Sequence, residues 1–374
     1  MPKHSRNDAE LDKKIEFPIL KKVHTDQHNQ PSSAEMTANK SIAVESTNPL
    51  QTKLTVEEAK LYDRQIRLWG MEAQQRMRNA RILVVGCTGL SNEVLKNIVL
   101  AGVGAVTIAD SEVVQAKDLG SQFFLRDADI GKNKAESVLP RIQELNPRVR
   151  VNAVSDDING LPDTFFTNYD IVCAIGQNPD IVAKINTIVR VKNILFWSAS
   201  IFGTFGYMFS DLQDYRYSAI SKSADSKEPQ HTPAQLLFCS FEQMLSTTFN
   251  HPKIDKRWRR RAHPLYFAIR VVWEYWMKHR RYPDINMPSD LQELNTMKLQ
   301  VTKLLECDGA FVEDELVRNV ANMVSVEVSA SCAVLGGILA QELLKALSRN
   351  DSPIHNVLLY DSWEAIAQVM KIMP

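Results

Sequence analysis

Three residues have the spacing of a nucleotide-binding turn and its acid. A short apolar run at 82–85 ends at Gly86, and Gly89 begins an apolar-periodic helix. Asp110 ends the next apolar run, roughly 20 residues after the turn. Strand, glycine-containing turn, helix and a second strand ending on an acid make up the opening unit of a doubly wound nucleotide-binding fold. The stretch 81–110 therefore predicts an α/β chain organised around this unit.

The same turn is incomplete as a phosphate cradle. In the pattern G-x-G-x-x-G, the middle glycine lets the backbone approach a pyrophosphate, and the last lets helix and strand pack closely. Thr88 and Ser91 stand at these two positions. Because a threonine side chain takes space that the phosphates need, the turn predicts the fold more strongly than it predicts a working phosphate site.

Two arginines precede the turn on a predicted helix. Thr55 and Glu58 have the spacing of an N-cap and its capping-box partner, and the helix is expected to continue unbroken to residue 80. Arg64 and Arg67 are three residues apart and share one face of it. Such a pair can grip phosphate, although two solvated surface charges are the simpler interpretation.

Composition excludes several classes of function. The 44 Lys and Arg residues balance the 44 Asp and Glu residues, so the net charge of zero argues against nucleic acid or an anionic membrane as the main partner. No apolar run has the length of a transmembrane helix, and the N-terminus lacks a signal-peptide core. The five scattered cysteines contain no C-x-x-C pair, which indicates reduced thiols in a cytosolic or nuclear protein and no structural metal site.

Length and composition also divide the chain. With 374 residues, a main domain with an insertion is expected. The segments are a disordered polar tail (1–53), the first part of the α/β domain (54–216), a flexible loop (217–235), an inserted, mainly helical domain (236–320), and a return to the α/β domain with a C-terminal strand and tail (321–374).

Several motifs, in their order, resemble the activating enzymes for ubiquitin-like proteins. They are YDRQIRLWG (62–70), the stretch 83–110, SQFFLRDADIGKNKAES (121–137), LNPRV (145–149), CAVLGGILAQELLKALS (332–348) and HNVLLYDS (355–362). Over residues 54–361, the chain is most similar to the smaller (Aos1-like), pseudo-catalytic subunit of the SUMO-activating enzyme. This resemblance implies a Rossmann-like, ThiF/MoeB-like adenylation domain, and it makes the helical insertion a vestigial half of the catalytic-cysteine domain.

The resemblance also assigns roles to residues. Arg64 matches an arginine that reaches in trans into the ATP site of the partner subunit. Asp110 matches the acid that holds the ribose, and Lys134 matches the lysine that holds phosphate; both would be vestigial cofactor-binding residues here. Gly120 and Ser121 stand where catalytic halves carry asparagine and arginine. The strand predicted at 169–175 is followed by no carboxylate that could hold magnesium.

The expected function follows from these matches. The chain would pair with a larger (Uba2-like) subunit, and that partner would bind Mg-ATP, adenylate the C-terminal glycine of SUMO and form the thioester. This chain alone would bind no nucleotide and would be inactive. Cys239 and Cys307 lack the sequence context of the family's nucleophile. The basic run 256–261 is either a nuclear import signal, a patch for an acidic partner or a charged helix face. A nuclear location is expected, with the cytoplasm as a second location.

Three other readings remain open at this stage. The inactive subunit of the NEDD8-activating enzyme would require a much larger insertion than residues 236–320 provide. A free-standing NAD(P)-dependent oxidoreductase would need the glycine that Thr88 replaces, and it would leave YDRQIRLWG unexplained. A non-enzymatic adaptor that binds a modifier without supporting catalysis would be insensitive to the loss of Arg64.

Overall fold

The computed structural model describes residues 53–221, 230–249 and 262–372. The predicted tail lies outside the described residues except for Lys53, and so does the basic run 256–261. The nuclear location expected from that run therefore stays a prediction. The described residues belong to one compact unit.

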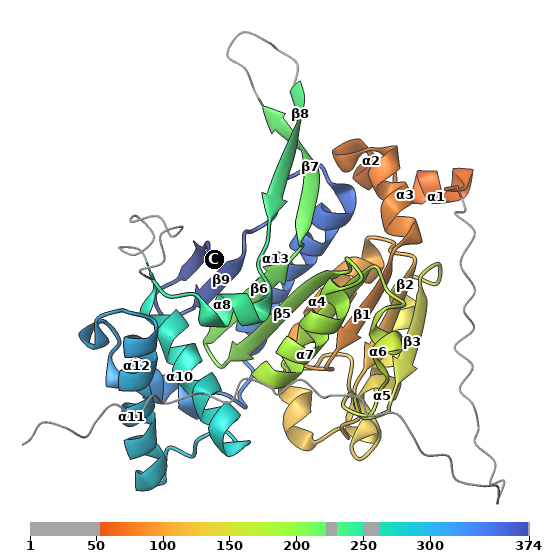
Figure 1. The fold of residues 1–374 in the computed structure, drawn as a ribbon. Helices are drawn as coiled ribbons and strands as arrows, with labels where there is room; N and C mark the ends of the chain where they lie inside the picture. Colours follow the sequence, from red (N-terminus) through yellow and green to blue (C-terminus); the bar gives the residue numbers. More distant parts are fainter. Residues whose placement is uncertain (1–52, 222–229, 250–261, 373–374) are drawn as a thin grey trace, which may run out of the picture. The chain divides into compact units, whose positions relative to one another are not determined.

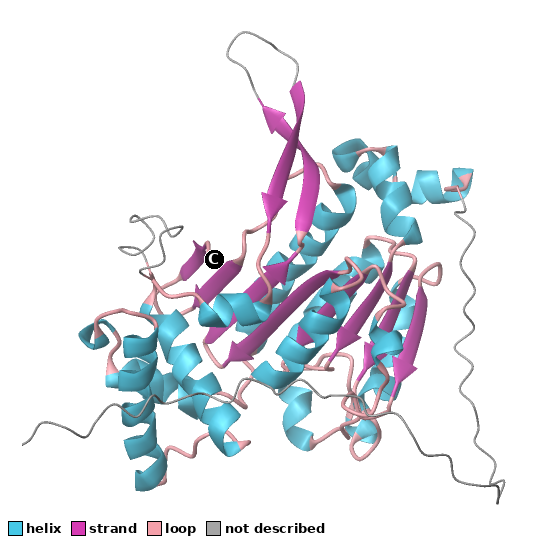
Figure 2. Cartoon of the chain, in the orientation of Figure 1, coloured by secondary structure: helices cyan, strands magenta, loops and turns pink. Residues whose placement is uncertain are grey.

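The core element of this unit is a mixed sheet of eight strands in the order β10-β9-β6-β5-β4-β1-β2-β3 (Figures 1 and 2). The strands are β1 (Arg81–Val85), β2 (Ala105–Ala109), β3 (Arg150–Val154), β4 (Ile171–Ile175), β5 (Leu195–Phe202), β6 (Phe205–Asp211), β9 (Val357–Asp361) and β10 (Ile366–Met370). Strands β1 to β5 run parallel, whereas β6, β9 and β10 pair with their neighbours antiparallel. The carboxyl ends of β1, β2 and β4 therefore meet at one edge, where doubly wound sheets bind ligands.

Helices cover both faces of the sheet (Figure 2). On one face lie α6 (Asp163–Phe166), α7 (Pro179–Arg190), α8 (Phe241–Ser246), α10 (Pro264–His279), α11 (Pro288–Leu304) and α12 (Asp314–Asn322). On the other lie α3 (Met71–Asn79), α4 (Gly89–Leu100), α5 (Lys134–Leu145) and α13 (Ser329–Ser348). Leu83 and Val85 point into the first core, and Ile82 and Val84 into the second. Burial on both faces explains why β1 is apolar throughout instead of alternating.

The predicted continuous N-terminal helix is wrong, although its capping box is confirmed. The segment forms α1 (Val56–Leu61), α2 (Asp63–Trp69) and α3, with breaks at Tyr62 and Gly70. Gly70 has φ +90°, which ends α2. Tyr62 is buried, and its hydroxyl accepts a hydrogen bond from Asn146 Nδ2 at 2.9 Å. Long-range packing of Tyr62 thus sets a break that the local sequence does not show.

The predicted flexible loop 217–235 is also largely wrong. Strands β7 (Asp214–Ser221) and β8 (Gln230–Leu237) pair antiparallel as a hairpin that projects from the sheet (Figure 1). Tyr215 is buried at its base, stacks on Tyr217 and donates a hydrogen bond from its hydroxyl to Lys345 O at 3.2 Å. Pro233 fits here because this ribbon has only two strands, and proline is tolerated at such edges.

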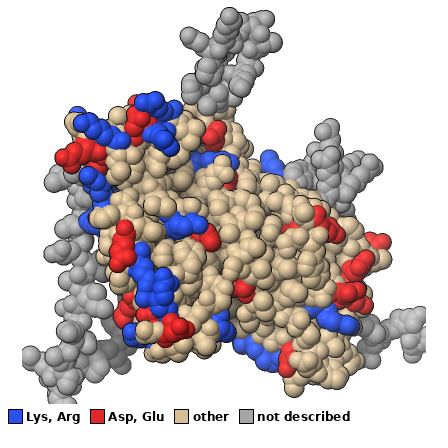
Figure 3. Space-filling view, turned by 180° about the vertical axis from the view of Figure 1, so that it is seen from behind, with Lys and Arg blue, Asp and Glu red and all other residues tan. Residues whose placement is uncertain are grey.

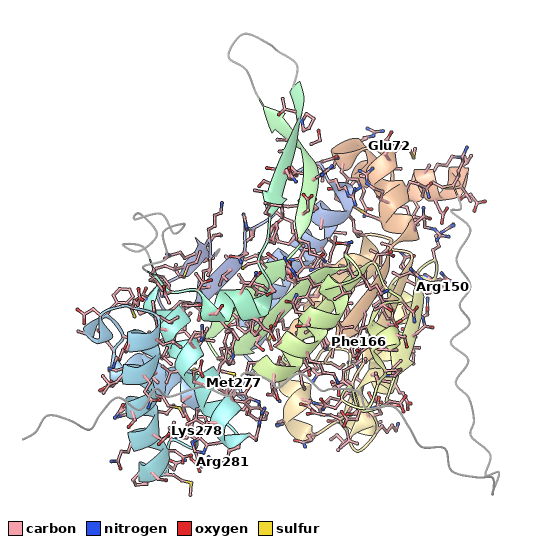
Figure 4. The ribbon with its side chains drawn as sticks, viewed as in Figure 1. Glu72, Arg150, Phe166, Met277, Lys278 and Arg281 are labelled. Carbon is pink, nitrogen blue, oxygen red and sulfur yellow. The ribbon has the colours of Figure 1, made fainter. Side chains whose placement is uncertain are left out.

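The helices of the 236–320 segment share a core with the sheet. Trp273 on α10 packs edge-on against Tyr207 of β6, with ring centroids 4.9 Å apart. At the far end of α10, ion pairs of Lys278 with Glu293 and of Arg281 with Asp290 join the α10 region to α11 (Figure 4). The described helices of this segment are thus packed onto the sheet and share its core.

A half-buried histidine near β9 makes stability depend on pH. Burial, together with the charge of Lys371, lowers the pKa of His355 to about 4, although a hydrogen bond with the backbone of Leu237 opposes the shift. At pH values between the ordinary pKa near 6.5 and this lowered pKa, His355 is protonated in the unfolded chain but not in the folded chain. The free energy of unfolding should therefore fall as the pH drops from about 6.5 to 4, by about 2 kcal/mol from this group.

The substitution His355→Gln should reduce that loss. Denaturant unfolding of both proteins at a series of pH values measures it, and identical pH profiles would contradict the assignment.

Candidate functional site

The sheet edge at the ends of β1, β2 and β4 opens into a cavity of about 620 Å³. Gly86, Thr88, Asp110 and Lys134 line it, so the structure brings together the turn and both vestigial residues named from the sequence. Gly86 has φ +97°, and an added Cβ would lie 2.1 Å from Ile175 O. Glycine is therefore required where β1 passes β4 into the turn.

Thr88 and Ser91 form hydrogen bonds within the turn that joins β1 to α4. Thr88 Oγ1 caps α4 by accepting a hydrogen bond from Ser91 N at 3.2 Å. Ser91 Oγ donates to Gly86 O at 2.6 Å. The side chains of Thr88 and Ser91, which replace two glycines of the cradle pattern, thus form hydrogen bonds with the backbone of the turn. Ser91 N, an N–H group that could otherwise bind a phosphate, is already bonded.

A carboxylate from a distant segment lies at the N-terminus of α4. Glu327 Oε2 accepts hydrogen bonds from Gly89 N at 2.8 Å and from Ser121 Oγ at 2.9 Å. Leu90 N lies 3.5 Å from the other oxygen. Sequence reasoning missed this residue, because 238 positions separate it from Gly89 and no local pattern marks it.

The carboxylate of Asp110 is hydrogen-bonded to the backbone of its own chain. Its two oxygens accept hydrogen bonds from Cys87 N at 2.6 Å and Glu112 N at 2.8 Å. Burial raises the pKa of Asp110, and these two hydrogen bonds oppose the shift. Asp110 therefore joins the ends of β1 and β2, and both of its oxygens already have a donor.

Lys134 is held in a similar way. The side chain is buried, with Nζ 2.8 Å from Glu112 Oε2 and 3.4 Å from Asp118 Oδ2. Burial lowers its pKa, the carboxylates of Glu112, Asp118 and Asp110 raise it, and the net direction is upward. The ammonium group stays charged, but carboxylates of its own chain take up that charge.

These contacts do not suit Mg-ATP in this pocket. Five carboxylates and two ammonium groups line it: Asp110, Glu112, Asp118, Asp157 and Glu327 against Lys117 and Lys134. After β4 the chain continues through Gly176, Gln177 and Asn178, so that strand end offers no carboxylate. A triphosphate would be repelled by the excess of carboxylates, and the first N–H groups of α4 are already bonded to Glu327.

Arg64 lies elsewhere. It is exposed on α2 and is not among the residues that line the cavity. Within the described ranges it makes no hydrogen bond or ion pair, whereas Arg67 is paired with Asp63 at 2.9 Å. The two arginines of α2 therefore differ in their pairing: Arg67 is bound to Asp63, whereas Arg64 is exposed and has no partner among the described residues.

A family model described as the ThiF family matches residues 62–374. The chain belongs to the ThiF family.

SUMO-activating enzyme subunit 1 of Rattus norvegicus is 36% identical over 327 residues, covering 82% of this chain and 92% of that protein. The Homo sapiens protein of the same name is 34% identical over 327 residues, covering 82% and 93%. The Dictyostelium discoideum protein is 32% identical over 330 residues, covering 87% and 97%.

These relatives place the chain among the SUMO-activating enzyme subunit 1 proteins of the ThiF family and confirm the resemblance that the motifs indicated. The α/β, Rossmann-like adenylation fold expected from the sequence is confirmed as well.

Neither cysteine of the 236–320 segment has the setting of a nucleophile. Burial raises the pKa of Cys239 to about 12 and that of Cys307 to about 11. The Cys239 thiol is buried and hydrogen-bonded to Ile372 O and Asn356 Nδ2. Because a thiolate is the reactive species, both settings oppose covalent chemistry.

One group near α10 has the composition of a metal site. His263, Asp361 and Glu364 bring potential ligand atoms within 4.8 Å of one another. However, His263 Nδ1 already accepts a hydrogen bond from Leu265 N at 3.2 Å, and its Nε2 lies 3.6 Å from Glu364 Oε2. The group is better explained as a cap of α10 that has an acid nearby.

Helix α13 is the one described helix long and apolar enough to span a bilayer by length and composition, contrary to the expectation from the sequence. It packs extensively on α4, and Glu342 within it is buried and accepts a hydrogen bond from Ile354 N at 2.6 Å. These contacts identify it as a core helix of the α/β domain.

Proposed function

We propose that this chain is the catalytically incomplete, regulatory subunit of a heterodimeric SUMO-activating enzyme. The larger subunit would bind Mg-ATP, adenylate the C-terminal glycine of SUMO with release of pyrophosphate, and carry the thioester. The similarity to proteins named SUMO-activating enzyme subunit 1 supports the activity, and the carboxylate of Glu327 at the N-terminus of α4 supports the division of roles between the subunits.

The observation that carries this proposal is the position of Arg64. An exposed arginine that has no partner among the described residues and lies outside the pocket of its own subunit suits donation in trans. Arginine fits this role because its planar guanidinium stays charged and can bind two phosphate oxygens at once. Arg64 would thus stabilise charge on the phosphates in the partner's site.

Helix α13 supports the heterodimer. On the side turned away from α4, it exposes a run of uncharged residues, Ala330, Ala333, Val334, Gly337 and Gln341. The middle of the corresponding molecular face is largely free of charged side chains, which gather toward its edges (Figure 3). Interface centres are depleted of charge in this way, so we assign this face to the larger subunit.

The isolated chain should catalyse no SUMO-dependent exchange between ATP and pyrophosphate, because carboxylates of the chain already occupy Lys134 and the first N–H groups of α4 in its own pocket. Incorporation of labelled pyrophosphate into ATP measures this, first with the purified chain and then after addition of the larger subunit. Exchange should occur only in the second sample. Robust exchange by the single chain would refute the proposed division of labour.

A further inference from the structure

Glu327 is held firmly where its carboxylate meets α4. Gly203 N donates to Val326 O at 2.8 Å, and Gly203 forms a parallel bridge with Glu327 itself. On the other side, Ser329 Oγ donates to Gly120 O at 3.0 Å. The backbone on both sides of Glu327 is therefore fixed before α13 begins.

The donors around this carboxylate are those that a phosphate group would use. Gly89 N and Leu90 N are the first N–H groups of α4, and Ser121 adds a hydroxyl from the neighbouring loop. The N-terminus of a helix favours an anion because its N–H groups lack partners and the helix dipole is positive there. An anion is already present at this place, and it belongs to the chain itself.

We propose that Glu327 is a built-in occupant of the phosphate cradle, so that its carboxylate holds the N-terminus of α4 in place of a phosphate group. The pocket would then be closed to nucleoside polyphosphates by occupancy and by charge, beyond the loss of contact groups at Thr88 and Ser91. This inference rests on the proposed function, in which nucleotide binds only to the larger subunit.

The residues around Glu327 add to the exclusion of polyphosphates from the pocket. Lys134, the nearest buried cation, is neutralised by Glu112 and Asp118, so it does not offset Glu327. Gly120 and Ser121, which stand where catalytic halves carry phosphate-binding side chains, instead contact the segment of Glu327. Removing the single carboxylate should therefore uncover a latent site for a polyphosphate anion at the first turn of α4.

The test uses the full-length chain and inorganic pyrophosphate as the probe. Glu327→Ala removes the occupant, and Glu327→Gln removes only its charge. Glu144→Ala is the control, since Glu144 is exposed on α5 and its side chain has no hydrogen bond or ion pair with another described residue. Titration calorimetry at constant ionic strength should show at least about tenfold tighter pyrophosphate binding by Glu327→Ala than by the unchanged chain or the control.

Thermal unfolding gives a second readout that also reports folding. Pyrophosphate should raise the melting temperature of Glu327→Ala, and less strongly that of Glu327→Gln, while leaving the control unchanged. If Glu327→Ala does not fold, Glu327→Gln alone decides the outcome by both measurements. Folded variants that bind pyrophosphate no better than the control would overturn the proposal.

The two proposals can fail separately. Pyrophosphate binding by the single chain requires neither the larger subunit nor Arg64. Loss of the exchange reaction on mutation of Arg64 requires no change in the pocket of this chain. A negative result for Glu327 therefore leaves the trans role of Arg64 intact, and the reverse also holds.

Discussion

Replacing Arg64 with alanine should slow SUMO-dependent ATP–pyrophosphate exchange by the heterodimer by about 10²–10³-fold, the effect of losing one well-placed donor from a charged transition state. The heterodimer should still assemble, and the chain should be as stable as before. Arg64 is exposed and has no partner within the described ranges, so its truncation removes no internal contact. The loss should appear in the rate constant at saturating ATP and SUMO.

Two variants make this result specific. Arg67→Ala removes an arginine from the same helix that is already paired with Asp63, and it should change the exchange rate little. Arg64→Lys keeps the charge but loses the planar fork, so it should recover only part of the rate. Full activity of Arg64→Ala in an intact heterodimer would exclude Arg64 from the ATP site and would favour an adaptor role.

The opening α/β unit could be predicted from the sequence because its signals are local. The apolar run of β1, the turn at Gly86 and Gly89, the apolar face of α4 and the acid after β2 lie within about 30 consecutive residues and follow the pattern of one known unit. Parallel strands buried on both faces leave few alternatives for such a pattern. The placement of Asp110 and Lys134 at one cavity followed from the same topology.

Contacts between distant segments could not be predicted in this way. The break at Tyr62 depends on Asn146, and the β7–β8 hairpin depends on burial of Tyr215 against the end of α13. Strand β10 gave no local signal that the sequence reasoning used, and β9 supplies its hydrogen-bonding edge.

The state of the candidate site depends on long-range contacts as well. The sequence named Lys134 and Asp110 as vestigial. Only the structure shows their bonding partners and the carboxylate of Glu327 at the cradle.

Two adjacent glycines on α13 allow a sharp test of the heterodimer interface. An added Cβ at Gly336 would lie 2.5 Å from Glu93 Cβ, so this glycine permits close packing on α4. Gly337 is partly exposed, and an added Cβ there would meet no atom within 4 Å. A side chain at Gly337 can therefore extend away from the chain's own core, into the space assigned to the larger subunit.

Gly337→Arg should accordingly leave this chain folded but weaken its association with the larger subunit by at least about 100-fold, or about 2.8 kcal/mol, because the new charge would be buried without a partner. Sedimentation of the mixed subunits over a range of concentrations measures the dissociation constant. Leu299→Arg, on an exposed position of α11, should associate normally. Exchange activity lost through Gly337→Arg should return when the larger subunit is supplied in excess, because the substitution acts on assembly and leaves Arg64 unchanged. Unaltered association would show that α13 does not face the partner.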